Sequence, residues 1–535
     1  MRTDRSELWK VIGASSAGTL IEWYDFYLFG SLAMVISTKF FPDTNPAAAF
    51  LSTLATFAAG FVVRPFGAMF FGHLGDVIGR KYTFLMTLLI MGGATFAIGV
   101  IPSYSAIGVA APILVLLLRL LQGLALGGEY GGAATYVAEH SPQGERGYWT
   151  SWIQTTATLG LFVSLAVILG CRSLMSAQAF NDWGWRIPFL LSIVLVGLSY
   201  VLRRKMKESP VFAAMKTSGK ASANPIRESF GNKENLRYVL IALLGATAGQ
   251  GVVWYTGQFY ALTFLQKTLA MDQVQANIII GAALLATTPL FVVMGALSDK
   301  VGRKPIMMLG CALAVVLYLP CFHGMAGIVQ SAGQQGVAQT AAAAVAIERA
   351  ATPQEVQGGA RPTDLVRVET DKVVFTDGSS AVRTTTTIRA GAVAGASAAE
   401  SPRAEVKDSL VRLSTARAVK CWLIVCVLVT LVTMVYGPIA AFLVELFPTR
   451  IRYTSMSLPY HIGNGVFGGM VPFVATWLSG SALAAPGGTL ATLAGGRDFV
   501  GLLYPISIAL LTLVVGLIWL PSKSTEADGQ RREPS

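Results

Sequence analysis

Charged side chains are scarce in this chain of 535 residues. Asp, Glu, Lys and Arg make up 13% of it, roughly half the share of a soluble protein. Hydrophobic residues make up 53%, and the mean hydropathy is +0.57. The net charge of +12 arises from basic residues in loops between apolar runs, so it does not indicate a nucleic-acid partner. The composition excludes an ordinary soluble protein and predicts one that lies in the lipid bilayer.

Residues that bind metals or perform covalent chemistry are also few. The chain has four histidines and five cysteines, without a C-x-x-C pair or the spacing of a metal site. We interpret the cysteines as apolar packing residues, and a disulfide between helix ends stays open. A glycine-rich run at 123–132 follows no strand and precedes no Lys-Ser/Thr, so it is not a phosphate-binding loop. These absences predict no metal, no cofactor, no enzymatic activity and no nucleotide-driven step.

Long apolar runs dominate the sequence instead. A helix needs roughly 20 apolar residues to span a bilayer. Twelve candidate runs lie near 11–36, 50–71, 82–101, 109–138, 149–171, 186–202, 237–265, 275–297, 305–325, 418–444, 454–479 and 499–520. They predict an all-α membrane protein.

Basic residues are distributed unevenly between the loops. The opening segment carries Arg2, Arg5 and Lys10, and nine basic residues lie between Arg203 and Arg237, whereas 102–108 has none. The positive-inside rule therefore predicts cytoplasmic termini and a cytoplasmic central loop. The first apolar run continues into carboxylates without a convincing cleavage site, so we expect no signal peptide.

A ten-residue pattern, G-x-L-x-D-x-x-G-R-K, occurs twice. The copies are Gly72–Lys81 and Gly295–Lys304, which are 295 − 72 = 223 residues apart. A repeat distance this long indicates two large halves. Glycines permit a tight reversal between helices, and Asp76 is expected to accept amide hydrogen bonds at the start of the next helix. A second repeat relates Glu139-x-x-Pro-x-x-x-Arg146 to Glu445-x-x-Pro-x-x-x-Arg452.

With these patterns the chain resembles the major facilitator superfamily, and more narrowly its metabolite:proton symporter group. The resemblance rests on the repeated loop and on four segments: EWYDFYLFG from Glu22, RPFGAMFFGHLGD from Arg64, LRLLQGLALGGEYGGA from Leu118 and DWGWRIPF from Asp182. It implies two pseudo-symmetric six-helix halves around one site. It also implies proton-coupled movement of a small acid or zwitterion, such as a di- or tricarboxylate, an aromatic acid, proline or a betaine.

Three carboxylates lie inside apolar runs. Glu22 and Asp25 are three residues apart and share a helical face, and Glu129 lies in the fourth run. Carboxylates in a membrane span usually face the protein interior or a watery cavity, and a desolvated carboxylate holds its proton more tightly. We predict that Asp25, Glu22 and Glu129 are candidates for proton coupling; a fixed ion pair with an arginine of another helix is the alternative.

Arginines and amides in the same runs are candidates for substrate binding. Arg119 lies deep in the fourth run and must pair with a carboxylate of the protein, of the substrate, or of each in turn. Arg64 is either a second ligand or a side chain that extends to the interface. Gln250, Trp254 and Gln258 step by four residues along one face. The other candidates are Tyr24, Tyr27, Gln122 and Gln154.

The resemblance also assigns a cytoplasmic latch to the repeated loops. In the first half it implies Gly72, Asp76, Gly79, Arg80, Glu139 and Arg146. In the second half it implies Asp299, Gly302, Arg303, Glu445 and Arg452. Such contacts bias one state of an alternating-access equilibrium.

The second half is longer than the first between matching positions, because it holds a low-complexity stretch. Asp377-Gly378 lies within an alternating segment and predicts a β-hairpin there. We divide the chain into a six-helix half (1–202), a central cytoplasmic loop (203–236), helices 7–9 (237–325), an extracytoplasmic insert (326–415), helices 10–12 (416–521) and a cytoplasmic tail (522–535).

The sequence therefore predicts a monomeric, proton-coupled secondary transporter of a bacterial inner membrane. It would import a small organic acid or zwitterionic metabolite by alternating access, with the solute, protons and the lipid bilayer as its partners. A proton-driven efflux antiporter and a non-transporting membrane sensor stay open as alternatives.

Overall fold

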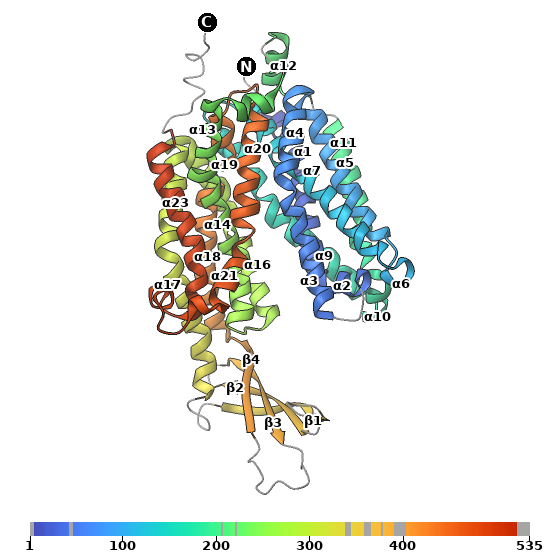
Figure 1. Ribbon diagram of the computed structural model, residues 1–535, viewed down its shortest axis with the longest axis vertical. Coiled ribbons are helices and arrows are strands. Elements are labelled where there is room, and N and C mark those ends of the chain that lie inside the picture. Colours follow the sequence, from blue (N-terminus) through green and yellow to red (C-terminus); the bar gives the residue numbers. More distant parts are fainter. Residues whose placement is uncertain are drawn as a thin grey trace.

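The computed structural model describes residues 5–41, 46–204, 207–219, 222–337, 344–357, 365–375, 378–389 and 403–521. The predicted tail at 522–535 lies outside them. The described chain folds into two helical bundles side by side and a separate small β-sheet (Figure 1). Both termini lie at one end of the molecule, and the sheet lies at the other (Figure 1).

The first bundle is built from the N-terminal part of the chain. Its helices are α1 (Arg5–Ser31), α2 (Ala33–Phe40), α3 (Pro46–Val62), α4 (Arg64–Val77), α5 (Arg80–Val100), α6 (Tyr104–Ile107), α7 (Ala110–His140), α8 (Arg146–Gln154), α9 (Thr156–Leu174), α10 (Ala177–Ala179), the π-helical η1 (Phe180–Gly184) and α11 (Arg186–Arg204). The connection to the second bundle holds α12 (Pro210–Thr217) and η2 (Arg227–Gly231).

The second bundle follows this connection and is interrupted by the sheet. Its α-helices are α13 (Lys233–Ala242), α14 (Ala248–Tyr255), α15 (Ala261–Thr263), α16 (Gln273–Val301), α17 (Arg303–Val337), α18 (Thr415–Tyr436), α19 (Ile439–Leu446), α20 (Arg452–Ile462), α21 (Val471–Gly480), α22 (Thr489–Ala494) and α23 (Leu503–Trp519). Shorter π-helical and 3₁₀ turns are η3 (Leu243–Thr247), η4 (Thr256–Tyr260), η5 (Phe264–Thr268), η6 (Gly463–Gly468), η7 (Ala482–Ala484) and η8 (Arg497–Leu502).

Within the described residues, nine helical stretches are long and apolar enough to cross a membrane. They coincide with nine of the twelve predicted runs. The other three predicted runs are helical as well, but α1 carries Glu22 and Asp25, α3 and α4 separate at Val63, and η6 interrupts the run at 454–479. α17 also continues to Val337, past the predicted end at 325, since no proline or strand signal follows there.

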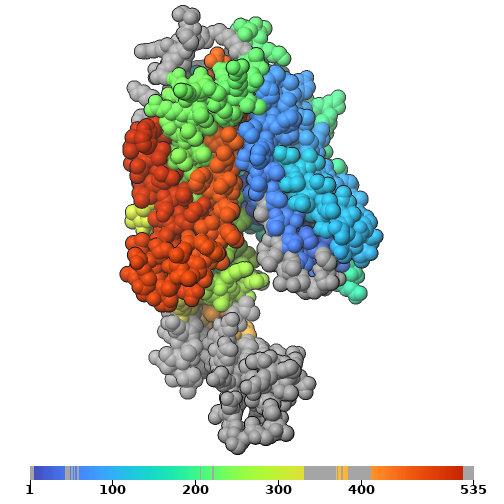
Figure 2. Space-filling model, in the orientation of Figure 1, coloured from blue at the N-terminus to red at the C-terminus, as the bar shows by residue number. Residues whose placement is uncertain are grey.

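The two bundles contact each other at the end that carries the termini. α20 packs on α4 and α8 packs on α16, so each pair takes one helix from each half. Toward the opposite end, a recess separates the two halves on the face drawn in Figure 2. The contacts between halves are therefore concentrated at one end of the molecule.

The sheet has four antiparallel strands in sequence order: β1 (Ala344–Gln357), β2 (Leu365–Phe375), β3 (Ser380–Arg389) and β4 (Arg403–Arg412). The predicted hairpin is confirmed, because Val374 pairs with Ser380 across a turn in which Gly378 has a φ of +80°. Asp377 lies outside the described residues. The insert thus forms a β-meander rather than a single hairpin.

The last residues of β4 attach the sheet to the loop that precedes α16. The Val411 amide donates to the Ala270 carbonyl at 2.9 Å, and the Asp272 amide donates to the Val411 carbonyl at 3.0 Å. The Gln275 side chain bonds both the amide and the carbonyl of Leu413, at 2.7 and 2.8 Å. Met271 is fully buried in this contact region. The sheet is therefore fixed to the link between α14 and α16.

Candidate functional site

The repeated loops join the two halves by capping each other's helices. Asp76, near the end of α4, accepts from the amides of Tyr453 (3.4 Å) and Thr454 (2.8 Å) in the first turn of α20. Asp299, near the end of α16, accepts from the amides of Gly147 and Tyr148 in the first turn of α8, both at 2.8 Å. An acidic group at a helix N-terminus satisfies orphan amides and complements the helix dipole.

This arrangement corrects the expectation that Asp76 caps the helix that follows it. The first amides of α5, those of Arg80 and Lys81, bond the carboxylate of Glu208 instead. Gly79 and Gly302 explain the difference, because their φ values of +130° and +97° turn the chain away before the next helix begins. Gly72 is equally constrained: a Cβ there would lie 2.9 Å from the Cα of Thr454.

Arginines of the same loops hold carboxylates at the helix ends. Arg80 lies 2.9 Å from Asp76 and 3.6 Å from Glu139, and all three are fully buried side chains. Arg303 lies 2.6 Å from Asp299 and 2.9 Å from Glu445. The two clusters repeat the same contacts in the two halves.

One member of the predicted latch lies in the other cluster. Arg452 was expected among the second-half residues, but its guanidinium lies 3.1 Å from Glu139 of the first half. It reaches Glu139 because α20 packs on α4 with Arg452 as its first residue. Arg146 occupies the corresponding first position of α8 and is buried. The first cluster is therefore shared by both halves.

Asp25 is held in a polar network inside the first half. Its carboxylate accepts from Arg119 (3.0 Å), Gln122 (2.9 Å) and Thr95 (3.0 Å). Gln122 also bonds Arg119 and Thr95. Each of these side chains is buried. Charged groups this deep in an apolar bundle require such pairing, since desolvation of an unpaired charge is costly.

Glu129 lies near the same face of α7 as Arg119, but the two residues belong to different ion pairs. Glu129 forms an ion pair with Arg203 and accepts from Thr87 at 2.9 Å. Arg203 was assigned to the cytoplasmic loop, but it lies in α11, is buried, and donates to the Phe84 carbonyl at 2.7 Å. Ser192, Val196 and Ser199 precede it on the buried face at helical spacing, and this signal could have identified it.

Glu22 and Arg64 form a looser pair nearer to the second half. Their charged atoms are 4.0 Å apart, and the Arg64 guanidinium lies over the Phe61 ring at 4.4 Å. The Phe61 ring packs on Phe26 of α1 with centroids 5.8 Å apart, and Phe26 packs on Phe259 of the second half at 5.5 Å. The pair therefore lies beside aromatic side chains that contact the second half.

Aromatic side chains of the two halves also pack on one another. The rings of Tyr130 and Tyr460 are stacked with centroids 3.7 Å apart, and the Tyr436 and Tyr460 hydroxyls bond at 2.8 Å. Trp23 of α1 packs on Trp254 of α14 at 5.0 Å. The composition pattern did not single out Tyr130 or Tyr436 as site residues, because an aromatic in an apolar helix is indistinguishable from a packing residue.

The other predicted substrate-binding residues lie either beside these aromatic side chains or in the interior of one half. Gln154 donates to the Tyr130 hydroxyl at 2.8 Å. Gln250 and Asn464 exchange amide hydrogen bonds at 3.1 and 2.9 Å. Tyr27 stacks on Phe259, and Gln258 is buried in η4. Tyr27 and Gln154 therefore border the contact between halves, whereas Gln250 and Gln258 are buried within the second half.

Tyr24 is not brought to this region. Its hydroxyl donates to the Pro188 carbonyl at 2.6 Å, and its ring is fully buried within the first half. Two residues along a helix turn a side chain by about 200°, so Tyr24 and Glu22 face nearly opposite directions. Tyr24 therefore lies within the core of the first half, away from the contact between the halves.

Comparisons with known proteins agree with this architecture. The profile of a family described as Sugar (and other) transporter matches residues 10–225 and 213–351, which together span more than half of the chain. A proline/betaine transporter of Escherichia coli (strain K12) is 34% identical over 331 residues, 60% of this chain and 65% of that protein. The chain thus covers slightly less than two thirds of that relative.

A citrate–proton symporter of Klebsiella pneumoniae is 35% identical over 314 residues, 58% of this chain and 69% of that protein. Among solved structures, the proton:xylose symporter XylE, bound to 6-bromo-6-deoxy-D-glucose, superposes with a TM-score of 0.64 at 16% identity. This superposition covers 99% of this chain and 100% of that one. At that identity the likeness concerns the fold.

Proposed function

Because the chain belongs to the sugar (and other) transporter family of the major facilitator superfamily, we propose that it is a proton-coupled secondary transporter. It takes up a small zwitterionic metabolite or organic acid by alternating access between its two halves, with cytoplasmic termini. The names of its relatives include carriers of proline and betaine and a symporter of citrate and protons. These names support a metabolite as the solute and a proton as the coupling ion.

The observation that carries the substrate proposal is the Glu22–Arg64 pair. The two charges are 4.0 Å apart and mostly buried, and Arg64 lies over the Phe61 ring, which packs on Phe26 and through it on Phe259 of the second half. An arginine suits a carboxylate, while a carboxylate and aromatic faces suit a substituted ammonium group. A solute that carries both charges would replace each partner of the pair. We therefore place a zwitterion before a simple carboxylate.

The proposed coupling group is Asp25. In the described state its charge is neutralised by Arg119 within the first half. Protonation of Asp25 would release the Arg119 guanidinium, which would then need a new partner or a new position. A buried ion pair that changes with proton binding provides two states of different conformational preference.

The function is tested by uptake into proteoliposomes that contain the purified full chain and have an alkaline interior. The radiolabelled panel holds proline, glycine betaine, citrate, α-ketoglutarate and shikimate, each with and without a protonophore. We expect uphill accumulation of proline or betaine that collapses with the protonophore. Extrusion along an outward-directed gradient would establish efflux instead, and binding without any flux would establish a sensor.

The Glu22–Arg64 pair gives a prediction about selectivity. Replacing Glu22 with glutamine removes the partner of the ammonium group and leaves Arg64 for the carboxylate. Because a hydrogen bond to a charged group contributes about 1.5–3 kcal/mol, KM for the zwitterion should rise about tenfold or more. KM for a carboxylate of similar size should change less. Adding Gln258→Glu to Glu22→Gln, which places a carboxylate at another buried amide position, is not expected to restore zwitterion uptake. Equal changes for both solutes would contradict the assignment.

The sheet gives a prediction about the insert. Its hydrogen bonds to the loop before α16 use residues 411–413, Val373 and Ala381 also pack against the bundle core, and α17 and α18 pack directly on each other. Replacing 344–408 with a Gly/Ser linker should therefore leave uptake within about twofold of the full chain. Val411→Pro, which removes the amide that bonds Ala270, is the matched control for the attachment. Loss of uptake in the deletion, with normal insertion, would assign the sheet a role in transport.

A further inference from the structure

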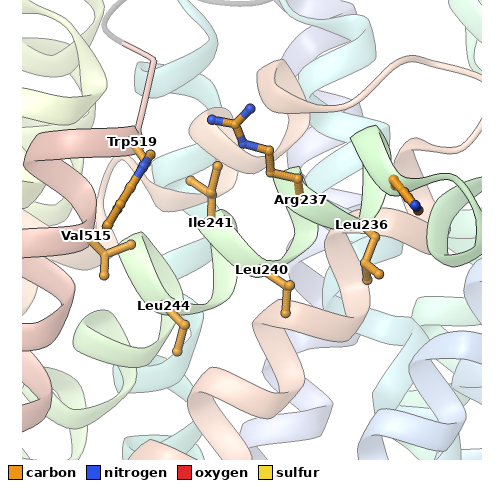
Figure 3. Close-up of a pocket in the computed structure, with 8 residues that line it drawn as sticks. Leu236, Arg237, Leu240, Ile241, Leu244, Val515 and Trp519 are labelled. Atoms are coloured by element: carbon orange, nitrogen blue, oxygen red, sulfur yellow. The ribbon is translucent and has the colours of Figure 1, made fainter.

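A groove lies on the outer surface of the second bundle, between α13 and α23 (Figure 3). Its volume is about 390 Å³. The apolar part of its lining comes from Leu236, Leu240, Ile241, Leu244, Val515 and Trp519. Leu240 and Trp519 are each about half exposed, at 48% and 49%. Because these helices belong to a membrane-spanning bundle, the surface that the groove opens onto faces lipid rather than the solute path.

One rim of the groove is basic. Lys233 is the first residue of α13 and Arg237 lies one turn later, and both are exposed. The Lys304 ammonium lies at the end of the other wall, where it donates to the carbonyls of Leu517 in α23 (2.9 Å) and of Leu520 directly after α23 (2.8 Å). Glu234 is the acidic residue in the first turn of α13, so the three cations outnumber it.

The basic rim and the apolar floor of the groove match the two parts of a phospholipid, the charged headgroup and the acyl chains. α13 begins with Lys233 near the end of the bundle that carries the termini (Figure 1), whereas Leu240 lies near the end of α13 and Leu244 lies in η3 (Figure 3). Trp519 lies at the end of α23, a position typical of the bilayer interface. We propose that this groove binds one anionic phospholipid, with an acyl chain along Leu240, Leu244 and Val515 and the phosphate at Lys233 and Arg237.

Charge complementarity favours this occupant over a neutral lipid. Basic residues next to a membrane surface attract anionic headgroups, which are enriched in the cytoplasmic leaflet, and this is the leaflet to which the positive-inside rule assigns this end. The lipid is connected to the proposed solute site through the helix it contacts. α13 continues through η3 into α14, and α14 carries Gln250 and Trp254. A bound lipid would therefore rest against the helix that forms the second-half wall of the proposed solute site.

The test is native mass spectrometry of the purified full chain with phosphatidylglycerol or phosphatidylcholine of identical acyl chains. We expect one tightly retained phosphatidylglycerol, and about tenfold or more weaker retention in Lys233→Gln/Arg237→Gln, because each basic residue contributes to the attraction. Arg204→Gln/Lys216→Gln is the matched control, since these two exposed cations lie at the same end without lining the groove. This control should retain the lipid like the unaltered chain.

Two additional arms distinguish a bound phospholipid from a free phosphate ion held by the basic rim. Val515→Trp fills the apolar part without changing charge and should also weaken retention, whereas millimolar inorganic phosphate should not displace the lipid. Thermal unfolding of each variant in detergent verifies that it is folded. Equal retention of both lipids, retention unaffected by Lys233→Gln/Arg237→Gln, or displacement by inorganic phosphate would each overturn the proposal.

Discussion

Replacing Asp25 with asparagine should abolish uphill, proton-linked accumulation while the protein remains in the membrane. Asparagine has nearly the same shape and can still bond Thr95 and Gln122, whose contacts to Asp25 are 3.0 and 2.9 Å. It cannot bind and release a proton, so a pH gradient would no longer be converted into a solute gradient. The accumulation ratio in proteoliposomes with an alkaline interior is expected to fall to that of a protonophore-treated control.

The cost of this change to stability must be separated from its effect on coupling. Asparagine leaves Arg119 buried without its counter-charge, which costs about 3–5 kcal/mol in typical proteins. Asp25→Asn/Arg119→Gln removes both charges and should recover most of the lost thermal stability without recovering accumulation. Asp182→Asn, at an exposed carboxylate of η1, is the matched control and should accumulate solute normally. Exchange of labelled for unlabelled solute, which needs no gradient, reports whether the site still binds.

Normal uphill transport by Asp25→Asn would exclude Asp25 as the coupling group. The next candidate would then be Glu22, whose ion pair with Arg64 at 4.0 Å is looser than the 3.0 Å pair of Asp25 with Arg119. Glu129 is a weaker candidate than either, since Arg203, Thr87 and the first-half helices enclose it.

The sequence was sufficient to predict the fold class, because the signals that define it are local or periodic. Apolar runs, basic loops and a repeat of ten residues can each be recognised without knowing which helices contact one another. The same signals located Asp25 and Arg119 as buried charges. They could not pair them, because the partner of a buried charge depends on helix packing and not on spacing within one helix.

Arg203 illustrates why pairing was beyond the sequence. It opens a run of basic residues that ends an apolar helix, which is the ordinary appearance of a cytoplasmic boundary. Its burial follows from the packing of α11 against α1 and α5, which brings its guanidinium to Glu129 and to the carbonyls of Phe84 and Ala14. A long side chain can extend either to water or to a buried carboxylate, and the packing of the helices determines which of the two it reaches.

The sequence also could not predict that Asp76 and Asp299 cap helices of the opposite half. Sequence position placed Asp76 and Asp299 immediately before α5 and α17, so the adjacent helix was the natural partner. The structure instead shows that each carboxylate reaches a helix from the opposite half, with matching amides in the first turns of α20 and α8. A repeat within one chain predicts that two loops are alike, but it does not state what they contact.

Removing either cap should open the end of the molecule at which the halves meet. Asp76→Ala deletes the bonds to the Tyr453 and Thr454 amides, and Asp299→Ala deletes those to Gly147 and Tyr148. If these two charge-assisted bonds contribute about 3 kcal/mol together, the closed state should lose about a hundredfold in population relative to the open one. Both variants should open this end, and Asp76→Ala should have the larger effect because Asp76 also accepts from the Thr454 hydroxyl at 2.7 Å.

The opening can be measured by maleimide labelling of Ser457→Cys in a background without the five native cysteines. Ser457 is buried on α20 against Gly131 of α7, between the two halves, so its label rate reports their separation. Asp272→Ala is the matched control, because Asp272 caps α16 within one half by accepting from the Gln275 amide at 2.9 Å. It should lower stability by about 1 kcal/mol without raising the label rate. Unchanged labelling in Asp76→Ala and Asp299→Ala, or an equal increase in Asp272→Ala, would show that the two halves are held together at this end by packing and arginine pairs rather than by the caps.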